Sequence, residues 1–360
     1  TAQTDSLPAV PEKEVPRPAK AEGTELTKIL QNITFGGVFQ AHYLTSLSSG
    51  VNYKGVHYGD EKHSSNSFDI RRMRIQMQAT ITEKMKVVVL ANFADFKTDP
   101  KNKVLENAYL SYDHNKYLNF RIGQFRPKVG PENTYAVDVV KSLDFSNAYY
   151  GFSSNGWGSF QVGADLSGNV NLGKIPLSYN VAVFNGNNRN KTDDDNGKLF
   201  FTREVFTLSK KYGLNIGLNG GWGRASDKDV HFASADISAL IPITTRWSAS
   251  LEAQAGEANN YVSFFSTEKD LREGPLSDYI MRGWYALPNI RYELGNKHLH
   301  SLELSCRYEQ WENNKLDNNL GQTITPAFSM EFIKNYKLRL TLAMQMNRFK
   351  HSIPQTDQYN

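Results

Sequence analysis

Apolar and polar residues alternate along most of the chain between residues 33 and 349. In residues 72–81 the odd positions carry Met73, Ile75, Met77, Ala79 and Ile81, and the even positions carry Arg, Gln or Thr. The same alternation recurs in residues 118–125, 158–166, 177–184, 213–222, 232–241, 246–256, 298–309 and 337–347. A period of two is that of a β-strand with one apolar face. Repeated this often, it predicts an all-β, transmembrane antiparallel β-barrel.

The connections between these segments fit the same architecture. We expect a first strand at 33–45 and then hairpins at 67–82/84–96, 104–114/116–126, 157–168/175–186, 199–210/213–224, 230–241/245–257, 280–294/298–311 and 321–333/336–350. Short turns within the hairpins alternate with long polar loops between them. Outer-membrane barrels have this arrangement, with short periplasmic turns and long outer loops.

The strand count is odd. Fifteen strands are visible, whereas a single-chain bacterial barrel needs an even number to close antiparallel. We therefore expect about sixteen strands, with the sixteenth missing from the chain as given, because residues 351–360 have the composition of a loop. The alternative is a fifteen-stranded or rearranged barrel.

One domain is expected, after an N-terminal extension. Residues 1–32 form a Pro-rich N-terminal extension, with four prolines among alternating charges and a short helix at 24–31. Residues 33–360 form the outer-membrane barrel. The chain begins without a charged and apolar leader, so we expect a signal peptide to have been removed already.

Composition narrows the classes of protein. Hydrophobic residues make up 39% and aromatic residues 12% of the chain, and no run of about 18 apolar residues exists, which excludes a helical membrane protein. Several apolar faces end in Tyr, Trp or Phe, as the aromatic girdles of a barrel do. Ordinary aromatic packing in a large soluble β-protein is the alternative.

Charge and motifs argue against several functions. The net charge of +4 is too small to indicate nucleic-acid binding. The lone Cys306 excludes Cys-rich zinc sites, and Asp193, Asp194 and Asp195 lack the glutamate that a calcium loop needs. No catalytic triad or carboxylate pair stands out, so we expect neither an enzyme nor a cofactor or metal site.

Five segments resemble the phosphate-selective porin O and P family. They are FDIRRMRIQMQATI (68–81), VLENAYLSYD (104–113), LNFRIGQFRPKVGPENT (118–134), SLDFSNA (142–148) and VAVFNGNN (181–188). The resemblance implies a sixteen-stranded, trimeric outer-membrane porin whose third long loop folds inward and narrows the pore.

That loop would span residues 126–156. Pro127, Gly130 and Pro131 would bend it out of the wall, and a connection of thirty residues is otherwise unexpected in a compact barrel. Its charged residues are Lys128, Glu132, Asp138, Lys141 and Asp144. Because this set is close to neutral, we do not expect the family's phosphate preference to carry over.

The polar face of each strand supplies the expected pore lining. The basic candidates are Arg72, Arg74, Lys86, Arg121, Arg203, Arg291, Arg307 and Arg339, with Lys337 beside them. Arg72, Arg74 and Arg121 could form a positive wall that favours ion permeation. Alternatively, these charges pair with the acidic candidates Asp165, Asp236, Glu252, Glu303, Glu309 and Glu331 and only hydrate the channel.

These patterns predict a bacterial outer-membrane porin for passive diffusion of small hydrophilic or anionic solutes. Its partners would be outer-membrane lipid and lipopolysaccharide, and two further copies in a homotrimer. The alternative is a barrel scaffold or binding subunit, held to a partner protein by the N-terminal extension or the outer loops.

Overall fold

The computed structural model of the chain describes residues 32–57, 63–94, 104–193 and 195–350. The Pro-rich extension, the expected helix at 24–31 and residues 351–360 lie outside these ranges. The expected sixteenth strand, which would close the barrel, also lies outside the described residues, so it stays a prediction.

The described residues form one antiparallel sheet of sixteen strands. The strands are β1 (Ile33–Thr45), β2 (Asn66–Thr82), β3 (Met85–Asn92), β4 (Leu105–Asn115), β5 (Leu118–Phe125), β6 (Gln161–Leu172), β7 (Ile175–Phe184), β8 (Leu199–Ser209), β9 (Leu214–Ala225), β10 (Lys228–Pro242), β11 (Trp247–Asn259), β12 (Ile280–Glu293), β13 (Ser301–Glu312), β14 (Gly321–Ile333), β15 (Leu338–Ala343) and β16 (Met346–Phe349). All eight predicted strand regions, the first strand and the seven hairpins, are confirmed.

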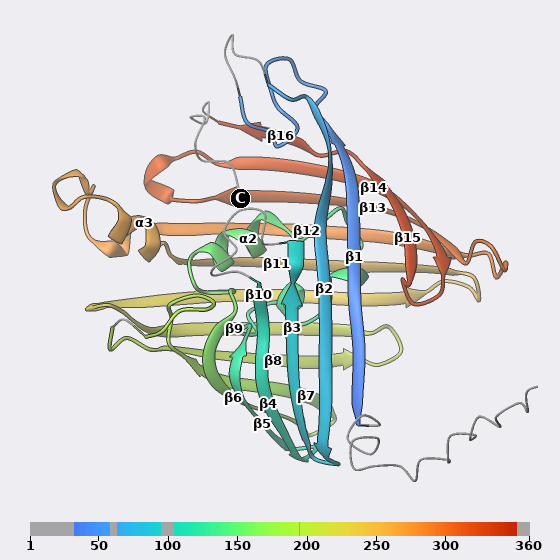
Figure 1. The fold of residues 1–360 in the computed structure, drawn as a ribbon, viewed down its shortest axis with the longest axis horizontal. Coiled ribbons are helices and arrows are strands. Elements are labelled where there is room, and N and C mark those ends of the chain that lie inside the picture. Colours follow the sequence, from blue (N-terminus) through green and yellow to red (C-terminus); the bar gives the residue numbers. More distant parts are fainter. Residues whose placement is uncertain (1–31, 58–62, 95–103, 194, 351–360) are drawn as a thin grey trace, which may run out of the picture.

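Each strand from β1 to β14 pairs with the next along the chain, and the sheet curls into a barrel (Figure 1). The last predicted strand, 336–350, is in fact two segments. β15 and β16 pair with successive parts of β14, so they share one position at the edge of the sheet. Within the described residues no ladder joins this edge to β1.

The helices of the described residues all lie in connections between strands. They are α2 (Asn147–Ser154), α3 (Tyr261–Ser266) and the short 3-10 helices η2 (Pro131–Asn133), η3 (Val137–Val139), η4 (Lys269–Leu271), η5 (Leu276–Asp278) and η6 (Lys315–Asp317). In the parts of the chain that the structure describes, no helix is long and apolar enough to cross a membrane.

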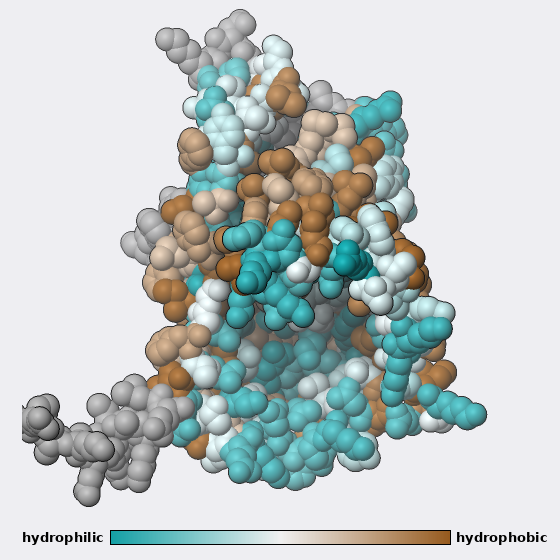
Figure 2. Space-filling view, turned by 90° about the vertical axis from the view of Figure 1, so that its right-hand side faces the viewer, coloured by the Kyte–Doolittle hydropathy of each residue, from teal (hydrophilic) through white to brown (hydrophobic). Residues whose placement is uncertain are grey.

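The outward face of the wall is apolar, as the alternation predicts. Large apolar side chains such as Ile122, Val181 and Leu304 are exposed on it. Figure 2, which shows the side where the turn between β14 and β15 lies, has hydrophobic residues over parts of the wall and hydrophilic residues around a hollowed region. Lipid covers such an outer band in a membrane barrel, and the paired strands leave few backbone groups unsatisfied.

The sequence predicts a polar inward face, but part of the inward face is apolar. Near the long-loop ends of the strands, inward side chains form an apolar cluster with α2 and the loops. Phe184, Phe201, Phe232 and Met281 belong to it and are at most 2% exposed. The period of two distinguishes the two faces of each strand, but it does not predict which part of the inner face an inward-folded loop will cover.

Candidate pore constriction

The connection between β5 and β6, residues 126–156, lies inside the barrel and is called the inward loop here. It contains η2, η3 and α2, and Figure 1 shows α2 within the ring of strands. Pro127 and Pro131 cannot donate to a strand ladder, which is consistent with β5 ending at Phe125. The predicted inward fold of this loop is confirmed.

Side chains of the wall satisfy the backbone of the inward loop. Gln254 Nε2 donates to the carbonyl of Val129 at 2.8 Å, and Arg339 Nη1 donates to the carbonyl of Val140 at 2.7 Å. Ser305 Oγ and Arg307 Nη1 donate to the carbonyls of Lys141 and Asp144. Buried carbonyls need such partners, because a polar group left unpaired away from water is costly. The loop is therefore tied to β11, β13 and β15.

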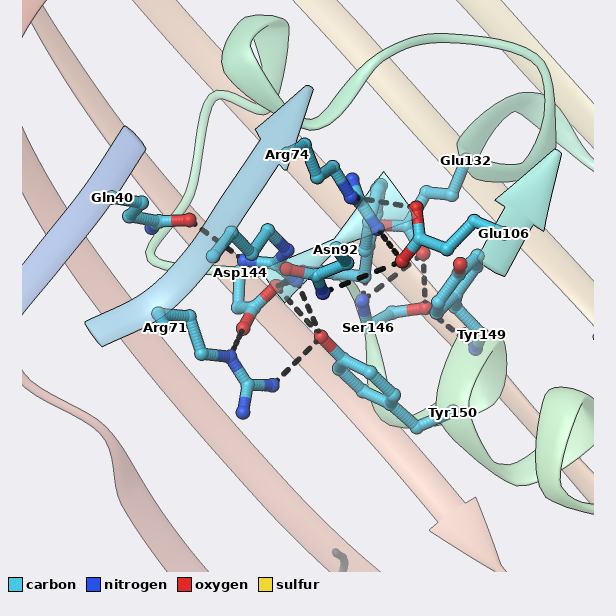
Figure 3. A network of polar contacts seen from close by, with 12 residues as sticks. Gln40, Arg71, Arg74, Asn92, Glu106, Glu132, Asp144, Ser146, Tyr149 and Tyr150 are labelled. Carbon is cyan, nitrogen blue, oxygen red and sulfur yellow. Dashed lines mark hydrogen bonds and ion pairs between the residues drawn. The ribbon is translucent and has the colours of Figure 1, made fainter. Parts of the chain in front are cut away.

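Asp144 makes the strongest attachment, to the opposite wall. Its Oδ1 lies 2.6 Å from Arg72 Nη2 and its Oδ2 lies 2.8 Å from Arg71 Nε. Tyr150 OH, on α2, donates to Asp144 Oδ1 at 2.8 Å. Figure 3 shows Arg71, Asp144 and Tyr150 converging, and Arg72 Nη1 also donates to Gln40 Oε1 at 2.8 Å. We call Arg71, Arg72, Asp144 and Tyr150 the clasp.

A β-bulge makes the clasp possible. The β1–β2 register runs from Gln40 opposite Arg72 to Ala41 opposite Ile70, so Arg71 is the extra residue. A bulge lets two consecutive side chains act on one side of the sheet. Burial would raise the pKa of Asp144, but Arg72 and Arg71 outweigh burial and hold this pKa well below its ordinary value. Asp144 is thus a buried anion shared by two cations.

Glu132 ties two parts of the inward loop together. Its carboxylate accepts hydrogen bonds from the backbone N of Ser146, at 3.0 Å to each oxygen, and from Ser146 Oγ. Ser146 is the N-cap of α2, where the helix dipole favours negative charge. Complete burial nevertheless raises the pKa of Glu132 to about 8, although Arg307 acts in the opposite direction.

Aromatic packing fixes the other end of the inward loop. The ring of Phe152 packs edge-on against Trp311 and Phe232, with centroids 5.1 and 5.0 Å apart. Gly151 lies so close to Trp311 that a Cβ there would come 2.0 Å from its Cζ2 atom. Trp157 Nε1 donates to the carbonyl of Asn259 at 3.0 Å. The loop therefore has little freedom to move without repacking this cluster.

Most of the predicted pore-lining cations are ion-paired. The pairs are Arg72–Asp144, Arg74–Glu106, Lys86–Asp113, Arg121–Asp165, Arg203–Asp236, Arg291 with Glu303 and Glu331, and Arg307–Glu309. Arg339 binds a loop carbonyl instead. Arg72, Arg74 and Arg121, which were expected to form a positive wall, are therefore each paired with a carboxylate. This agrees with the alternative that the charges of the lumen pair with one another.

Two cations at the start of the inward loop have no carboxylate partner among the described residues. Arg126 donates to Tyr149 OH and to the carbonyl of Tyr135, and Lys128 makes no hydrogen bond or ion pair there. Burial lowers the pKa of Lys128, and the nearby Arg121 and Arg203 lower it further, whereas Asp165 acts in the opposite direction. This surplus of positive charge is the main electrostatic feature of the constriction.

These cations face a hollow of about 360 Å³ between the inward loop and strands β1 to β5. We call it the cationic hollow. Its charged lining consists of Arg74, Arg121, Arg126 and Lys128 against Glu106 and Asp138. Even when Asp165, the partner of Arg121, is included, cations outnumber carboxylates.

Sequence reasoning missed Arg71, Arg126, Tyr135 and Tyr150. Strict alternation places Arg71 on the lipid face, and an arginine at that position was the one sign of a bulge. Arg126 follows the last residue of a strand, where alternation no longer assigns a side. The tyrosines carried no signal of their own, since their role depends on the loop conformation.

Comparison with known proteins agrees with this architecture. The family described as phosphate-selective porin O and P matches residues 47–285. No curated protein matches the sequence significantly. Among solved structures, the anion-selective porin from Comamonas acidovorans is similar with a TM-score of 0.54 at 10% identity, covering 88% of this chain and 89% of that chain.

Two further structures are similar over the same extent. The outer membrane channel DcaP of Acinetobacter baumannii has a TM-score of 0.51 at 11% identity, covering 88% of this chain and 90% of that one. The in-vitro folded trimer form of OmpT from Vibrio cholerae has a TM-score of 0.52 at 11% identity, covering 88% of both chains. At such low identity these likenesses show the shared fold.

Proposed function

The chain belongs to the phosphate-selective porin O and P family, and we propose that this outer-membrane channel passes small hydrophilic solutes with a mild preference for anions. The observation that carries the preference is the surplus of positive charge in the cationic hollow. A channel wall with uncompensated cations raises the local concentration of anions and lowers that of cations. Family membership favours this passive channel over the scaffold alternative.

The preference is expected to be weak and general. Arg126 and Lys128 are the two cations without a carboxylate, whereas Arg74 and Arg121 are each engaged by one. A site that selects one oxyanion would need several convergent donors around a single position. Partial neutralisation supports attraction of chloride, phosphate and organic anions alike.

Reversal potentials across a planar bilayer test this proposal. Under a KCl gradient the wild-type channel should favour chloride, and the double variant Arg126→Gln, Lys128→Gln should lower the chloride-to-potassium permeability ratio by roughly two- to fivefold, as expected for partly exposed charges. Lys174→Gln, in the exposed turn between β6 and β7, is the matched control and should leave the ratio unchanged. An unchanged ratio in the double variant would rule out the cationic hollow as the selective element.

The assembly and the domain division belong to the same proposal. A homotrimer embedded in outer-membrane lipid and lipopolysaccharide is supported by the fold, and one structural relative has been solved as a trimer. The division into an extension, 1–32, and a barrel from residue 33 is supported by the start of β1 at Ile33. Native mass spectrometry of the detergent-extracted protein should give the mass of three chains, and a monomer would contradict the trimer.

A further inference from the structure

A second hollow lies on the other side of the inward loop, against strands β10 to β12. Its volume is about 250 Å³, and Tyr135 lines both this hollow and the cationic one. Its remaining lining combines a lysine, a carboxylate, hydroxyl groups and aliphatic side chains. We call it the mixed hollow. Its charged lining is one lysine and one carboxylate, Lys141 and Glu252, whereas cations predominate in the lining of the cationic hollow.

Lys141 supplies the positive charge of the mixed hollow. Its Nζ donates to Ser250 Oγ at 2.7 Å and has no ion-pair partner among the described residues. Among the carboxylates, Glu303 acts most strongly on the charge of Lys141, but its Oε1 is engaged by Arg291 at 2.6 Å and by Tyr336 OH at 2.9 Å. The ammonium group of Lys141 therefore keeps a donor available to a solute.

Glu252 supplies the negative charge. Its Oε1 accepts hydrogen bonds from Tyr135 OH at 2.9 Å and from Tyr285 OH at 2.8 Å. Its Oε2 accepts none from the described residues and is not among their buried unpaired atoms, so this oxygen is not completely buried. Two tyrosines hold the carboxylate in one orientation while leaving one oxygen free.

Aliphatic side chains complete the lining. Val139 of η3, Leu240 of β10 and Leu287 of β12 contribute to the mixed hollow, and the side chains of strand positions 240 and 287 follow the inward alternation of Asp236 and Tyr285. Apolar groups within a water-filled passage favour a solute that also carries an apolar part. A volume of about 250 Å³ is below the roughly 300–1,000 Å³ of sites for drug-sized ligands, which limits the solute to a small one.

We propose that the mixed hollow is a subsite for zwitterionic amino acids with aliphatic side chains. The carboxylate of the solute would approach Lys141, its ammonium group would approach Glu252 Oε2, and its side chain would lie against Val139, Leu240 and Leu287. Within the part of the chain that the structure describes, neither protein charge is neutralised by an ion pair, and a zwitterion complements both at once. This inference rests on the proposed function, because the solute reaches the hollow only through an open channel.

An inorganic anion fits the mixed hollow less well. A free anion would gain from Lys141 but would be repelled by Glu252, which lies close enough to act on the charge of Lys141. The two hollows thus divide the solutes by charge: the cationic hollow attracts net anions, and the mixed hollow favours solutes that carry both signs. A sugar would gain hydrogen bonds from the hydroxyl groups but nothing from the two charges.

Liposome swelling with purified channels tests this division. The probes are L-leucine, leucinamide (which lacks the carboxylate), 4-methylvalerate (which lacks the ammonium group) and arabinose as a neutral solute of similar size. Wild-type channels should admit leucine faster, relative to arabinose, than leucinamide, a cation that neither hollow favours, while 4-methylvalerate reports the anion preference of the cationic hollow. Glu252→Gln and Lys141→Gln should each lower the leucine-to-arabinose ratio by roughly two- to fivefold.

Control variants distinguish loss of the subsite from loss of the channel itself. Lys141→Arg keeps the charge and should retain most of the ratio, and Lys191→Gln, on the exposed loop between β7 and β8, should retain all of it. Variants are compared only when their KCl conductance remains, so a misfolded channel is recognised. Retained conductance with an unchanged leucine ratio would overturn the zwitterion subsite alone. A wild type without conductance would overturn the channel, and this inference with it.

Discussion

Asp144 of the inward loop lies 2.6 Å from Arg72 of β2, a separation of 72 residues along the chain. The same carboxylate reaches Arg71, because the bulge turns two consecutive guanidinium groups toward the lumen. One loop residue therefore connects the constriction to the β1–β2 edge of the barrel. The contacts of Arg307 and Arg339 connect it to the opposite wall.

Removing the charge of Asp144 should loosen the constriction. Asp144→Asn leaves Arg72, whose side chain is only 6% exposed, without its carboxylate. Breaking such a buried pair typically costs about 3–5 kcal/mol. We expect larger and noisier single-channel currents, because the loop would leave its position more often.

Asp113→Asn is the matched control for this change. It breaks the Lys86–Asp113 pair, in which both side chains are more than one third exposed. Exposed pairs contribute about 0–1 kcal/mol, so the current should stay as quiet as that of the wild type. Equal noise in the two variants would contradict the role of the clasp.

The attachment of the inward loop should weaken as pH rises through the neutral range. The pKa of Glu132 is raised from its ordinary 4.5 to about 8, so the folded loop binds a proton that the released loop gives up. Its contribution to stability is fully present below pH 4.5 and is lost as pH rises through 8. Current flicker should therefore increase between pH 5 and pH 8.5.

Glu132→Gln isolates this effect. Glutamine can still accept the hydrogen bond from the backbone N of Ser146 but does not titrate, so flicker should depend much less on pH. Asp144 acts in the opposite direction, because its lowered pKa stabilises the loop above its ordinary value of 3.8 and does so constantly over pH 5 to 8.5. A Glu132→Gln channel that keeps the full pH dependence would refute this assignment.

The contact between Gly151 and Trp311 should not tolerate a methyl group. A Cβ at Gly151 would lie 2.0 Å from the indole ring, so Gly151→Ala must displace α2 or Trp311. Overpacking of this kind costs about 1–3 kcal/mol. The temperature at which the folded barrel converts to the slower-migrating unfolded form on a gel should fall.

Gly36→Ala provides the comparison for that experiment. A Cβ at Gly36 would meet no heavy atom within 4 Å, and the unfolding temperature should be close to that of the wild type. If both alanine variants unfold at the same temperature, the packing of α2 on Trp311 does not stabilise the barrel.

The N-terminal extension should be dispensable for conduction. The sheet begins at Ile33, and no contact of the inward loop described above involves a residue before it. A chain that starts at residue 32 should conduct KCl like the full chain. A loss of conductance in protein that still inserts into membranes would show that the extension belongs to the channel.

The sequence predicted the strands well because the period of two survives in each of them. It also predicted the inward loop, through the family resemblance supported by the length and the prolines of this segment. It could not predict the ion pairs, which depend on register: Arg121 lies opposite Asp165, and Arg291 lies opposite Glu303, only after neighbouring strands have paired. Periodicity assigns a side chain to one face of the sheet, but it does not predict which residue lies opposite that side chain on the neighbouring strand.

Arg71 and Phe232 show two further limits of the pattern. A bulge shifts the alternation by one residue, so the side chain of Arg71 faces the lumen, whereas its position in the sequence predicts the lipid face. Phe232 faces inward although the lumen was expected to be polar, and Phe152 of the inward loop and Trp157, the residue after that loop, cover it. Both effects come from contacts between distant segments.

Single-channel recording of the purified wild-type protein in a planar bilayer tests the central claim most directly. A passive porin with a constriction fixed by the inward loop should give discrete, stable current steps that increase linearly with voltage. Under a KCl gradient the reversal potential should have the sign of chloride preference. Absence of ohmic steps, or a reversal potential with the sign of potassium preference, would contradict the account.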